Sequence, residues 1–437
     1  MLLNSMTLEN FRCFENQTIQ FNNQFNLIVG DNASGKTAVL EAVSIGMSSF
    51  LSGLTNLDPN HKRSIRDYDV RIKANNLGEL TEYEKIYPVR LNFEFEFSDE
   101  TVSFERIRIS DRGRTKFGPK DTQMKEITRD LNDTFKEGAE KILPAFAYHG
   151  TGRLWASGLR YRKEKRLGNR VFGYQNCFKP QSNEKQYLRW MKEMKRYELD
   201  EEKKSVELAA VFKAAESFME ESFMEKGTKI AYRLKTDELT ITLPDGVAMP
   251  FDKLSDGYKN ALGIVFDTAF RMVKLNPWLR EEAVKRTPGI ILIDEIDLHL
   301  HPSWQKSIVK AFKRTFPSMQ IIATTHAPIV ISSCEKDEII MLEEAHEGEN
   351  TNQITVKTPE RSTKGWLTED ILEEIMQVNS SRESDTEEQI EKFKLLNEKK
   401  LLKTITDEEL EEFFQLKETL SRSLPNDDPI ITIIGLE

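Results

Sequence analysis

A glycine-rich stretch near the amino terminus carries residue types that can hold phosphate groups. Residues 30–37 read Gly-Asp-Asn-Ala-Ser-Gly-Lys-Thr, after a mostly apolar run and before a helical pattern. The glycines let successive backbone amides converge on phosphate oxygens, Lys36 adds a positive charge, and the Thr37 hydroxyl is a suitable Mg²⁺ ligand. The strand-loop-helix context argues against a chance match. The sequence predicts a nucleotide site formed by Asn32, Ala33, Ser34, Gly35, Lys36 and Thr37.

A second stretch places two carboxylates at the end of an apolar strand. Residues 290–293 are all apolar, and Asp294 and Glu295 follow directly. Because consecutive strand residues point to opposite sides, the two acids can do different work. We expect Asp294 to lie at the Mg²⁺ and Glu295 to act as general base toward the attacking water. The alternative is an ordinary buried strand with a solvated acidic end.

Three histidines lie near these carboxylates in the sequence. His326 follows the apolar run 320–323, and the carboxyl end of such a strand is where α/β proteins bind ligands. It is therefore predicted to hydrogen-bond the γ-phosphate, with a packing role as the alternative. The close spacing of His299 and His301 would suit a metal, but no third ligand is evident, so a role in loop structure is favoured.

Positioning these residues requires a parallel sheet with helices beside it. The pattern alternates helix over 258–273, strand over 290–293, helix over 303–316 and strand over 320–325. Such alternation is typical of an α/β sandwich. The glycine-rich stretch lies more than 200 residues upstream, so we expect one nucleotide-binding domain with a long insertion.

The remaining elements surround that domain. Residues 2–14 and 18–21 read as an opening hairpin, and strict alternation over 89–97 and 102–109 predicts a half-exposed antiparallel hairpin. The stretch 184–225 is dense in Lys, Glu, Met and Leu without sustained heptads, which indicates an inserted helical arm.

Composition bounds the class of protein. The chain has 437 residues, a formal charge of -10 and three cysteines without ligand-like spacing. These features suit a reducing compartment and argue against disulfides. No apolar run approaches the roughly 20 residues that cross a bilayer, and the first ten residues lack signal-peptide features. We therefore expect a cytoplasmic protein without membrane association.

Charge is distributed unevenly along the chain. Residues 151–180 carry eight basic residues against one acid, whereas residues 361–437 carry 10 basic and 19 acidic residues, a net charge of -9. The basic patch predicts DNA binding through residues 151–180. A solvated face, or a docking site for the acidic tail, remains the alternative.

The acidic tail is too apolar to be a disordered brush. Apolar residues recur at helical spacing from Trp366 to Met376, and capping-box patterns begin at Ser384 and Thr406. Faces of this kind must bury against something. The chain's own core or a second protomer is slightly favoured over an external partner.

The four motifs together resemble one superfamily. Residues 30–37, 254–258 (Leu-Ser-Asp-Gly-Tyr), 290–295 and 324–326 occur in the order of Walker A, signature, Walker B and switch histidine of ABC-type ATPases. That resemblance implies two heads closing on two ATP molecules, with Ser255 and Gly257 contacting the γ-phosphate held by the opposing protomer. Asp256 stands where the signature more usually has glycine.

Further details resemble the RecF/SMC-like branch of that superfamily. Residues 8–12 (Leu-Glu-Asn-Phe-Arg) resemble its opening strand, which implies that Arg12 approaches the nucleotide phosphates, and residues 294–302 resemble its Asp-Glu to His-Pro run. The chain as a whole looks like the stand-alone ATPases of Septu-type anti-phage defence, which work with a separate HNH nuclease. No stretch after His326 looks like a nuclease module.

These observations lead to one fold and one functional hypothesis. We expect an α/β fold, namely an ABC-type P-loop NTPase head with an antiparallel β subdomain, an inserted helical arm and a C-terminal helical tail, divided as 1–154, 155–228, 229–360 and 361–437. The expected function is an ATP- and Mg²⁺-dependent ATPase that forms a homo-dimer or higher homo-oligomer and controls an HNH nuclease in anti-phage defence. The alternative is a RecF/SMC-like DNA-repair or DNA-clamping ATPase.

Overall fold

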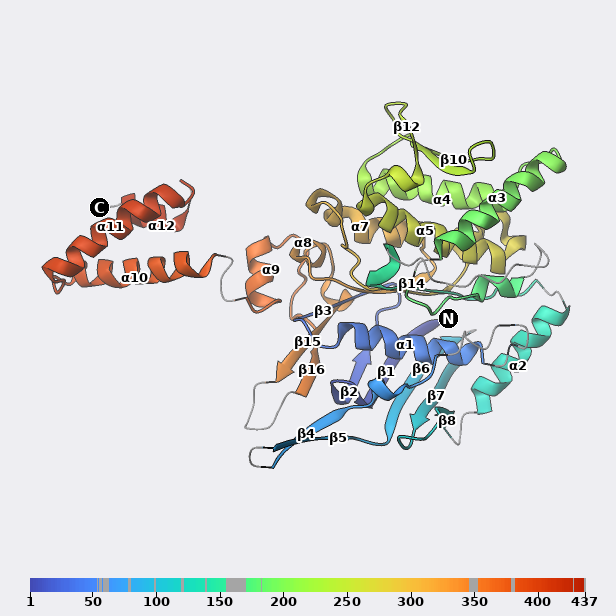
Figure 1. Ribbon diagram of the computed structural model, residues 1–437, viewed down its shortest axis with the longest axis horizontal. Helices are drawn as coiled ribbons and strands as arrows, with labels where there is room; N and C mark the ends of the chain where they lie inside the picture. The colour runs from blue at the N-terminus through green and yellow to red at the C-terminus, as the bar shows by residue number, and fades with distance from the viewer. Residues whose placement is uncertain are drawn as a thin grey trace. The chain divides into compact units, whose positions relative to one another are not determined.

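The computed structural model divides the chain into two compact units. The first unit spans Met1–Trp366 and the second spans Leu367–Glu437, and each is described by itself (Figure 1). The predicted division at residues 154, 228 and 360 remains a prediction. The structure describes residues 1–52, 54, 57, 63–77, 80–97, 100–118, 122–137, 140–154, 170–181, 183–345, 353–378, 382–426 and 428–435.

A six-stranded sheet forms the centre of the first unit. In spatial order its strands are β16 (Gln353–Lys357), β15 (Ile339–Ala345), β3 (Phe25–Gly30), β14 (Met319–Thr324), β13 (Gly289–Ile293) and β9 (Ala145–His149). Only the β15–β16 pair is antiparallel among these pairings. Every residue of β9, β13 and β14 is buried, as the continuous apolar runs predict for strands covered on both faces. β3 therefore lies between strands from the distant half of the chain.

A second, antiparallel sheet belongs to the first third of the chain. Its order is β2 (Phe14–Gln20), β1 (Leu2–Phe11), β6 (Val89–Phe97), β7 (Glu100–Arg108) and β8 (Lys116–Phe117). The predicted hairpin of alternating residues is the β6–β7 pair. Its inward side chains include Phe95 and Phe104, whose rings stack at 5.7 Å. The hairpin of β4 (Ile72–Leu77) and β5 (Leu80–Lys85) and the helix α2 (Thr122–Glu137) complete this region.

Helix α1 (Lys36–Phe50) contacts strands of both sheets. A Cβ at Gly46 would lie 2.5 Å from the Phe93 ring, so only glycine allows this close approach between helix and second sheet. The helix that follows the glycine-rich stretch is thereby held on two sides, which fixes the position of its amino terminus.

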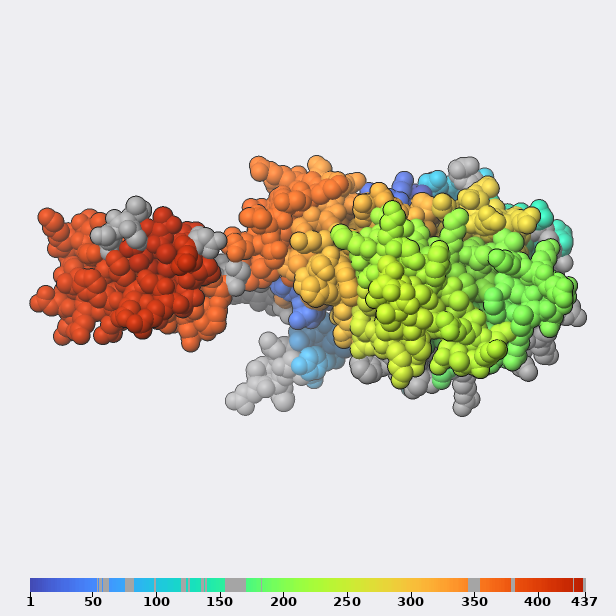
Figure 2. Space-filling model, turned by 90° about the horizontal axis from the view of Figure 1, so that it is seen from above, coloured from blue at the N-terminus to red at the C-terminus, as the bar shows by residue number. Residues whose placement is uncertain are grey.

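Further helices cover the central sheet. α5 (Asp256–Leu275) and α7 (Pro302–Thr315) pack against the inserted helices α3 (Glu184–Asp200) and α4 (Val206–Phe223), through ring contacts such as Phe218–Phe312 at 4.9 Å. The inserted helices therefore lie along the unit as a layer. With β10 (Lys229–Arg233), β11 (Glu238–Thr242) and β12 (Ala248–Pro250) they form much of the face of the first unit seen in green and yellow in Figure 2. The short helices of this unit are α6 (Ala283–Arg286) and α8 (Pro328–Ile331).

The second unit has a small core of its own. It contains α9 (Thr368–Glu374), α10 (Ser384–Leu401), α11 (Asp407–Ser423) and α12 (Pro429–Gly435). The apolar faces of the last three helices bury against one another, with Phe393 and Phe413 stacked at 5.1 Å. The apolar faces of these helices are therefore already buried within the second unit. Among the described residues, no helix combines the length and apolar character needed to cross a membrane.

Helix starts in the second unit test the capping predictions. At α11 the Thr406 hydroxyl accepts a hydrogen bond from Glu409 N, and the Glu409 carboxylate accepts one from Thr406 N, as predicted. At α10 the prediction is wrong by one residue, because Glu383 and not Ser384 caps the helix. A carboxylate can accept the same amide bonds as a serine hydroxyl, and the sequence pattern alone did not separate the two.

Candidate nucleotide-binding site

One cavity of about 390 Å³ collects most of the predicted site residues. It lies where β3 passes into α1 and where β13 and β14 end, at one edge of the parallel sheet. Three predicted residues, Ser34, Ser255 and Gly257, are not among its lining residues. The lining residues are Arg12, Cys13, Asn32, Ala33, Gly35, Lys36, Thr37, Ala38, Asp294, Glu295, Thr324 and His326.

The loop between β3 and α1 adopts a conformation that suits glycine. Gly35 has a φ of 96°, and a Cβ there would lie 2.5 Å from Cys13 Sγ. Ala33 also has a positive φ, of 71°. Such a loop turns its amides toward one point at the amino terminus of α1, where the helix dipole adds positive potential. Ser34 is buried on the inner side of this loop rather than facing the cavity.

The lysine of this loop is bound to the loop itself. Lys36 Nζ donates to the carbonyl oxygens of Gly30 and Asp31, each at 2.7 Å. Burial lowers the pKa of Lys36, while Asp294 and neighbouring acids act in the opposite direction. The ammonium group is therefore held at the mouth of the loop, where a phosphate would meet it.

Oxygen ligands from distant parts of the chain meet beside the loop. Thr37 Oγ1 donates to Asp294 Oδ2 at 3.0 Å, although the two residues are 257 positions apart. Thr324 Oγ1 donates to the other carboxylate oxygen at 2.7 Å and so fixes its orientation. A hydroxyl and a carboxylate side by side are donors that Mg²⁺ accepts. The residues present thus fit the predicted cation.

Glu295 continues directly from Asp294 but turns out of the strand. Its φ is 50°, an uncommon conformation for a residue with a side chain. Its amide donates to Thr324 Oγ1 at 2.8 Å, so one threonine organises both acids. The half-buried Glu295 side chain and the half-buried His326 imidazole both line the cavity. Both side chains can therefore contact a ligand that occupies the cavity.

Arg153 supports the acidic turn from behind. Its guanidinium donates to the carbonyl oxygens of Asp294 at 2.7 Å, Glu295 at 2.8 Å and Gly150 at 2.9 Å, and it also contacts Asn260 Oδ1. Burial lowers the pKa of Arg153 to about 10, so it stays charged at neutral pH. Sequence reasoning missed this role and assigned Arg153 to the basic patch.

The predicted basic patch 151–180 is only partly described. Arg160, Arg162, Lys163, Lys165 and Arg166 lie outside the described residues. Of the others, Arg153 is 6% exposed, and Arg170 stacks on the Trp278 ring at 4.1 Å while donating to Leu275 O. Arg153 is therefore buried within the first unit and does not belong to an exposed basic surface, whereas Arg170 is half-buried.

The signature residues lie at the start of α5, apart from the cavity lining. Ser255 is exposed, whereas Gly257 is buried, and a Cβ at Gly257 would lie 2.6 Å from the carbonyl oxygen of His299. Asn260 Nδ2, one turn further along, donates to Leu298 O at 2.7 Å. The start of α5 therefore packs on the turn that follows Glu295.

Of the two histidines of that turn, His301 has a structural contact. His301 Nδ1 accepts from Ser303 N at 3.3 Å and caps α7. His299 has a φ of 61° and an exposed side chain. Within the described ranges, no group of three or more His, Cys, Asp or Glu side chains is arranged to hold a metal ion.

Two family models match the chain. One, described as an AAA domain, matches residues 5–222, and the other, described as an AAA ATPase domain, matches residues 175–331. The retron Vc95 probable ATPase of Vibrio cholerae serotype O1 biovar El Tor is 26% identical over 375 residues, which cover 73% of this chain and 68% of that protein. The Septu protein PtuA of Bacillus mycoides is 27% identical over 388 residues, covering 85% of this chain and 44% of PtuA.

A solved structure shows the same fold. The SMC head bound to the C-winged helix domain of ScpA superposes with a TM-score of 0.50 at 15% identity, covering 82% of this chain and 98% of that one. At this identity the likeness is one of fold.

Proposed function

Since this chain is an ABC-type ATPase of the RecF/SMC-like branch and resembles the Septu protein PtuA, we propose that it hydrolyses ATP in an anti-phage defence complex and controls a separate HNH nuclease through ATP-dependent pairing of its heads. The relatives named for retron and Septu systems support the defence setting. The nuclease and the pairing are parts of the proposal.

The proposal that this chain hydrolyses ATP rests on four side chains that line one cavity, namely those of Thr37, Asp294, Glu295 and His326. These residues come from three sequence segments, and a packing role for each would not require a shared cavity. Bound ATP would place its phosphates on the amides of the loop and near Lys36. Mg²⁺ held by Thr37 and Asp294 would supply charge neutralisation of the phosphates.

Hydrolysis needs a base and a sensor at the far end of the triphosphate. In the proposal Glu295 accepts the proton of the attacking water, and His326 donates a hydrogen bond to the γ-phosphate. Arg153 holds the backbone of the turn, so that the Glu295 carboxylate keeps its position relative to the metal ligand Asp294. The unusual φ of Glu295 is maintained by these contacts.

The position of the signature residues supports action between two copies. Ser255 is exposed and does not line the cavity of its own protomer. In the proposal it reaches the γ-phosphate of a second copy, and the amino terminus of α5 directs positive potential there. Gly257 lies close to the carbonyl of His299, and this contact would link the binding of a second copy to the turn that carries Glu295.

The second unit is the proposed docking site for the nuclease. Residues 367–437 contain 8 basic and 19 acidic residues, a net charge of -11. Their main apolar faces are buried, but Leu401 and Phe414 remain 74% and 54% exposed. A nuclease that binds nucleic acid should be basic, so this charge would attract it from a distance, with the exposed apolar residues adding contact area.

ATP turnover and the oligomeric state test the proposal together. Lys36→Ala should bind ATP poorly, and Glu295→Gln should bind ATP but hydrolyse it about 10²–10⁴-fold more slowly, because the base is lost while the shape remains. Glu295→Gln should also elute as a stable dimer with ATP and as a monomer without it. Glu94→Gln, which changes an exposed carboxylate on β6, is the matched control. Wild-type turnover by Glu295→Gln would refute the catalytic assignment.

A further inference from the structure

Arg12 is the cation of the cavity that does not come from the glycine-rich loop. Its guanidinium is bound to Asp69: Nε donates to Oδ1 at 2.8 Å, and Nη2 lies 2.7 Å from the same oxygen. The backbone is bound as well, because Arg12 N donates to Asp69 O at 2.9 Å. Asp69 is 3% exposed, so water competes little for these contacts.

Other contacts leave the arginine little freedom. Its Cζ lies 5.4 Å from the centre of the Tyr68 ring and 5.6 Å from that of Phe11. The second oxygen of Asp69 accepts from Arg66 N at 2.9 Å, which fixes the carboxylate in turn. Arg12 has a φ of 51°, a backbone conformation that such contacts must hold in place.

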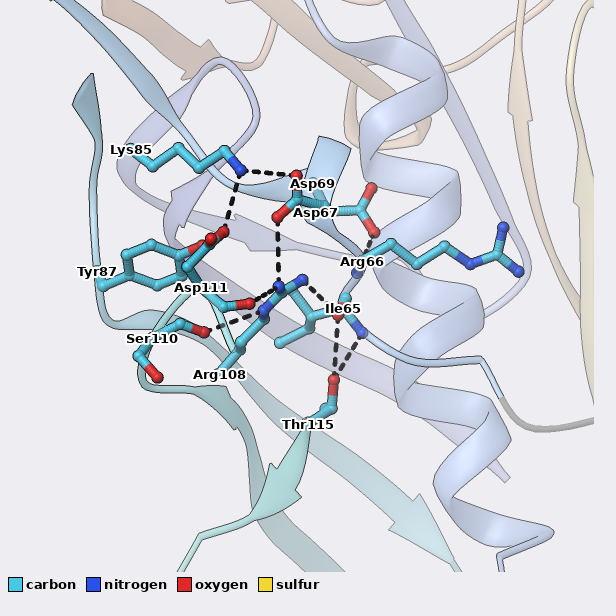
Figure 3. Close-up of polar contacts among 10 residues, drawn as sticks. All are labelled: Ile65, Arg66, Asp67, Asp69, Lys85, Tyr87, Arg108, Ser110, Asp111 and Thr115. Atoms are coloured by element: carbon cyan, nitrogen blue, oxygen red, sulfur yellow. Dashed lines mark hydrogen bonds and ion pairs between the residues drawn. The ribbon is translucent and has the colours of Figure 1, made fainter. Parts of the chain in front are cut away.

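The segment that carries Asp69 is anchored to the second sheet (Figure 3). Arg108 on β7 donates to Ile65 O at 3.3 Å and contacts Asp67, while Lys85 at the end of β5 donates to Asp67 at 2.6 Å and to Asp111 at 3.0 Å. Within that sheet, residues 65–70 therefore connect the end of β7 to the end of β1. The position of the Arg12 side chain depends on that connection.

We propose that Asp69 is a positioning residue of the nucleotide site, which holds the Arg12 guanidinium so that its free edge meets the phosphates of ATP. This inference rests on the proposed function, in which the cavity binds ATP. An unbound arginine would lose its rotamer freedom when ATP arrives, and the contact with Asp69 removes that cost before binding. The two donors facing Asp69 leave Nη1 directed elsewhere, and the side chain lines the cavity.

Asp69 has two physical effects on ATP affinity, and they act in opposite directions. Its negative charge offsets part of the attraction between Arg12 and phosphate, so a purely electrostatic effect would make ATP bind more tightly after Asp69→Asn. Its orienting effect predicts the reverse. Because the carboxylate is buried and contacts the guanidinium through two nitrogen atoms, the orienting effect dominates in this proposal. The direction of the change in affinity therefore separates the two.

The test measures ATP affinity of the full chain by titration calorimetry in the Glu295→Gln background, where hydrolysis is slow. Asp69→Asn should weaken ATP binding about tenfold, the scale of one charge-assisted hydrogen bond. Arg12→Ala should weaken it at least as much, and the double variant should bind like Arg12→Ala alone, since Asp69 acts through Arg12. Glu94→Gln, which changes an exposed carboxylate on β6 outside residues 65–70, should bind like the parent.

Arg12→Lys is a second variant, for use if Asp69→Asn does not fold. It keeps the positive charge and leaves the hydrogen bond from Arg66 N to Asp69 intact. It should lose about the same affinity, because a lysine cannot make the same two contacts. Parent-like or tighter binding by Asp69→Asn, full additivity with Arg12→Ala, or parent-like binding by Arg12→Lys would overturn the proposal. If the parent itself binds no ATP, or if Lys36→Ala binds like the parent, the proposed function fails instead.

Discussion

Arg153→Met is a perturbation whose cost follows from the contacts of one side chain. The substitution removes the guanidinium that donates to the carbonyl oxygens of Gly150, Asp294 and Glu295 and contacts Asn260. Methionine is shorter but also unbranched, and it can occupy the space of the aliphatic part of the arginine side chain. The expected defect is therefore the loss of these bonds, without a large cavity.

The magnitude follows from the number and kind of bonds lost. A hydrogen bond from a charged donor contributes about 1.5–3 kcal/mol, but bonds that share one side chain do not add. Removing one partner of a buried charged group typically costs about 3–5 kcal/mol. Part of that cost is recovered because the charge no longer has to be desolvated. We expect the free energy of unfolding to fall by about 3–4 kcal/mol, and the Tm of the first unit to fall by roughly 4–5 °C.

Chemical and thermal unfolding of the full chain provide the measurement, and DNA affinity is measured in parallel. Lys179→Met is the matched control, because Lys179 belongs to the same basic stretch and is only half-buried, and it should change stability by less than about 0.5 kcal/mol. If Arg153→Met unfolds like the wild type and instead loses DNA affinity, then Arg153 is a surface contact to nucleic acid and the reasoning from its buried bonds is wrong.

Three further predictions use other contacts. Burial lowers the pKa of His149 to about 4, so between pH 6.5 and 4 the unfolded chain binds a proton that the folded chain does not. The free energy of unfolding should therefore fall by roughly 3 kcal/mol as the pH drops through that window. Urea titrations at each pH measure this fall, which should be smaller in His149→Gln. Gly257→Ala places a Cβ 2.6 Å from the carbonyl oxygen of His299 and should lower ATP turnover at least tenfold while ATP affinity changes little. Gly263→Ala on the same helix, where a Cβ would meet only Tyr187 Oη at 3.8 Å, should lower neither. Equal turnover in the two variants would contradict the link between α5 and the turn. Deleting residues 367–437 should leave a folded first unit that hydrolyses ATP but no longer co-purifies with its nuclease, and retention of the nuclease would place the docking site elsewhere.

The local patterns of the sequence carried much of the fold and of the candidate site. Continuous apolar runs marked β13 and β14, and alternation marked β6 and β7, because burial on two faces and on one face leave different periodicities. Lys36 and Asp294 were predicted to lie at one edge of the sheet because each follows an apolar run read as a strand.

What the sequence could not provide are contacts between segments without a pattern. Arg153 was counted as part of a basic run, since nothing in a run of charges tells which side chain turns inward toward carbonyl oxygens. Thr324 was passed over in favour of the neighbouring His326, although its hydroxyl contacts Asp294 and the amide of Glu295. Asp69 lies in a polar stretch far from every motif, and only its contact with Arg12 distinguishes it.

The strand order has a consequence for synthesis on the ribosome. β3 ends at Gly30, but its two neighbours in the sheet begin at Met319 and Ile339, so both of its edges stay unpaired until most of the chain has been made. At the roughly 5–20 residues per second of translation, this interval lasts on the order of 15–60 s. During that time the apolar strand β3 has no neighbouring strand to pair with, and nascent chains with unpaired apolar strands tend to aggregate or recruit chaperones. Premature termination before β14 would therefore yield a fragment that lacks both neighbours of β3 and leaves this apolar strand unpaired.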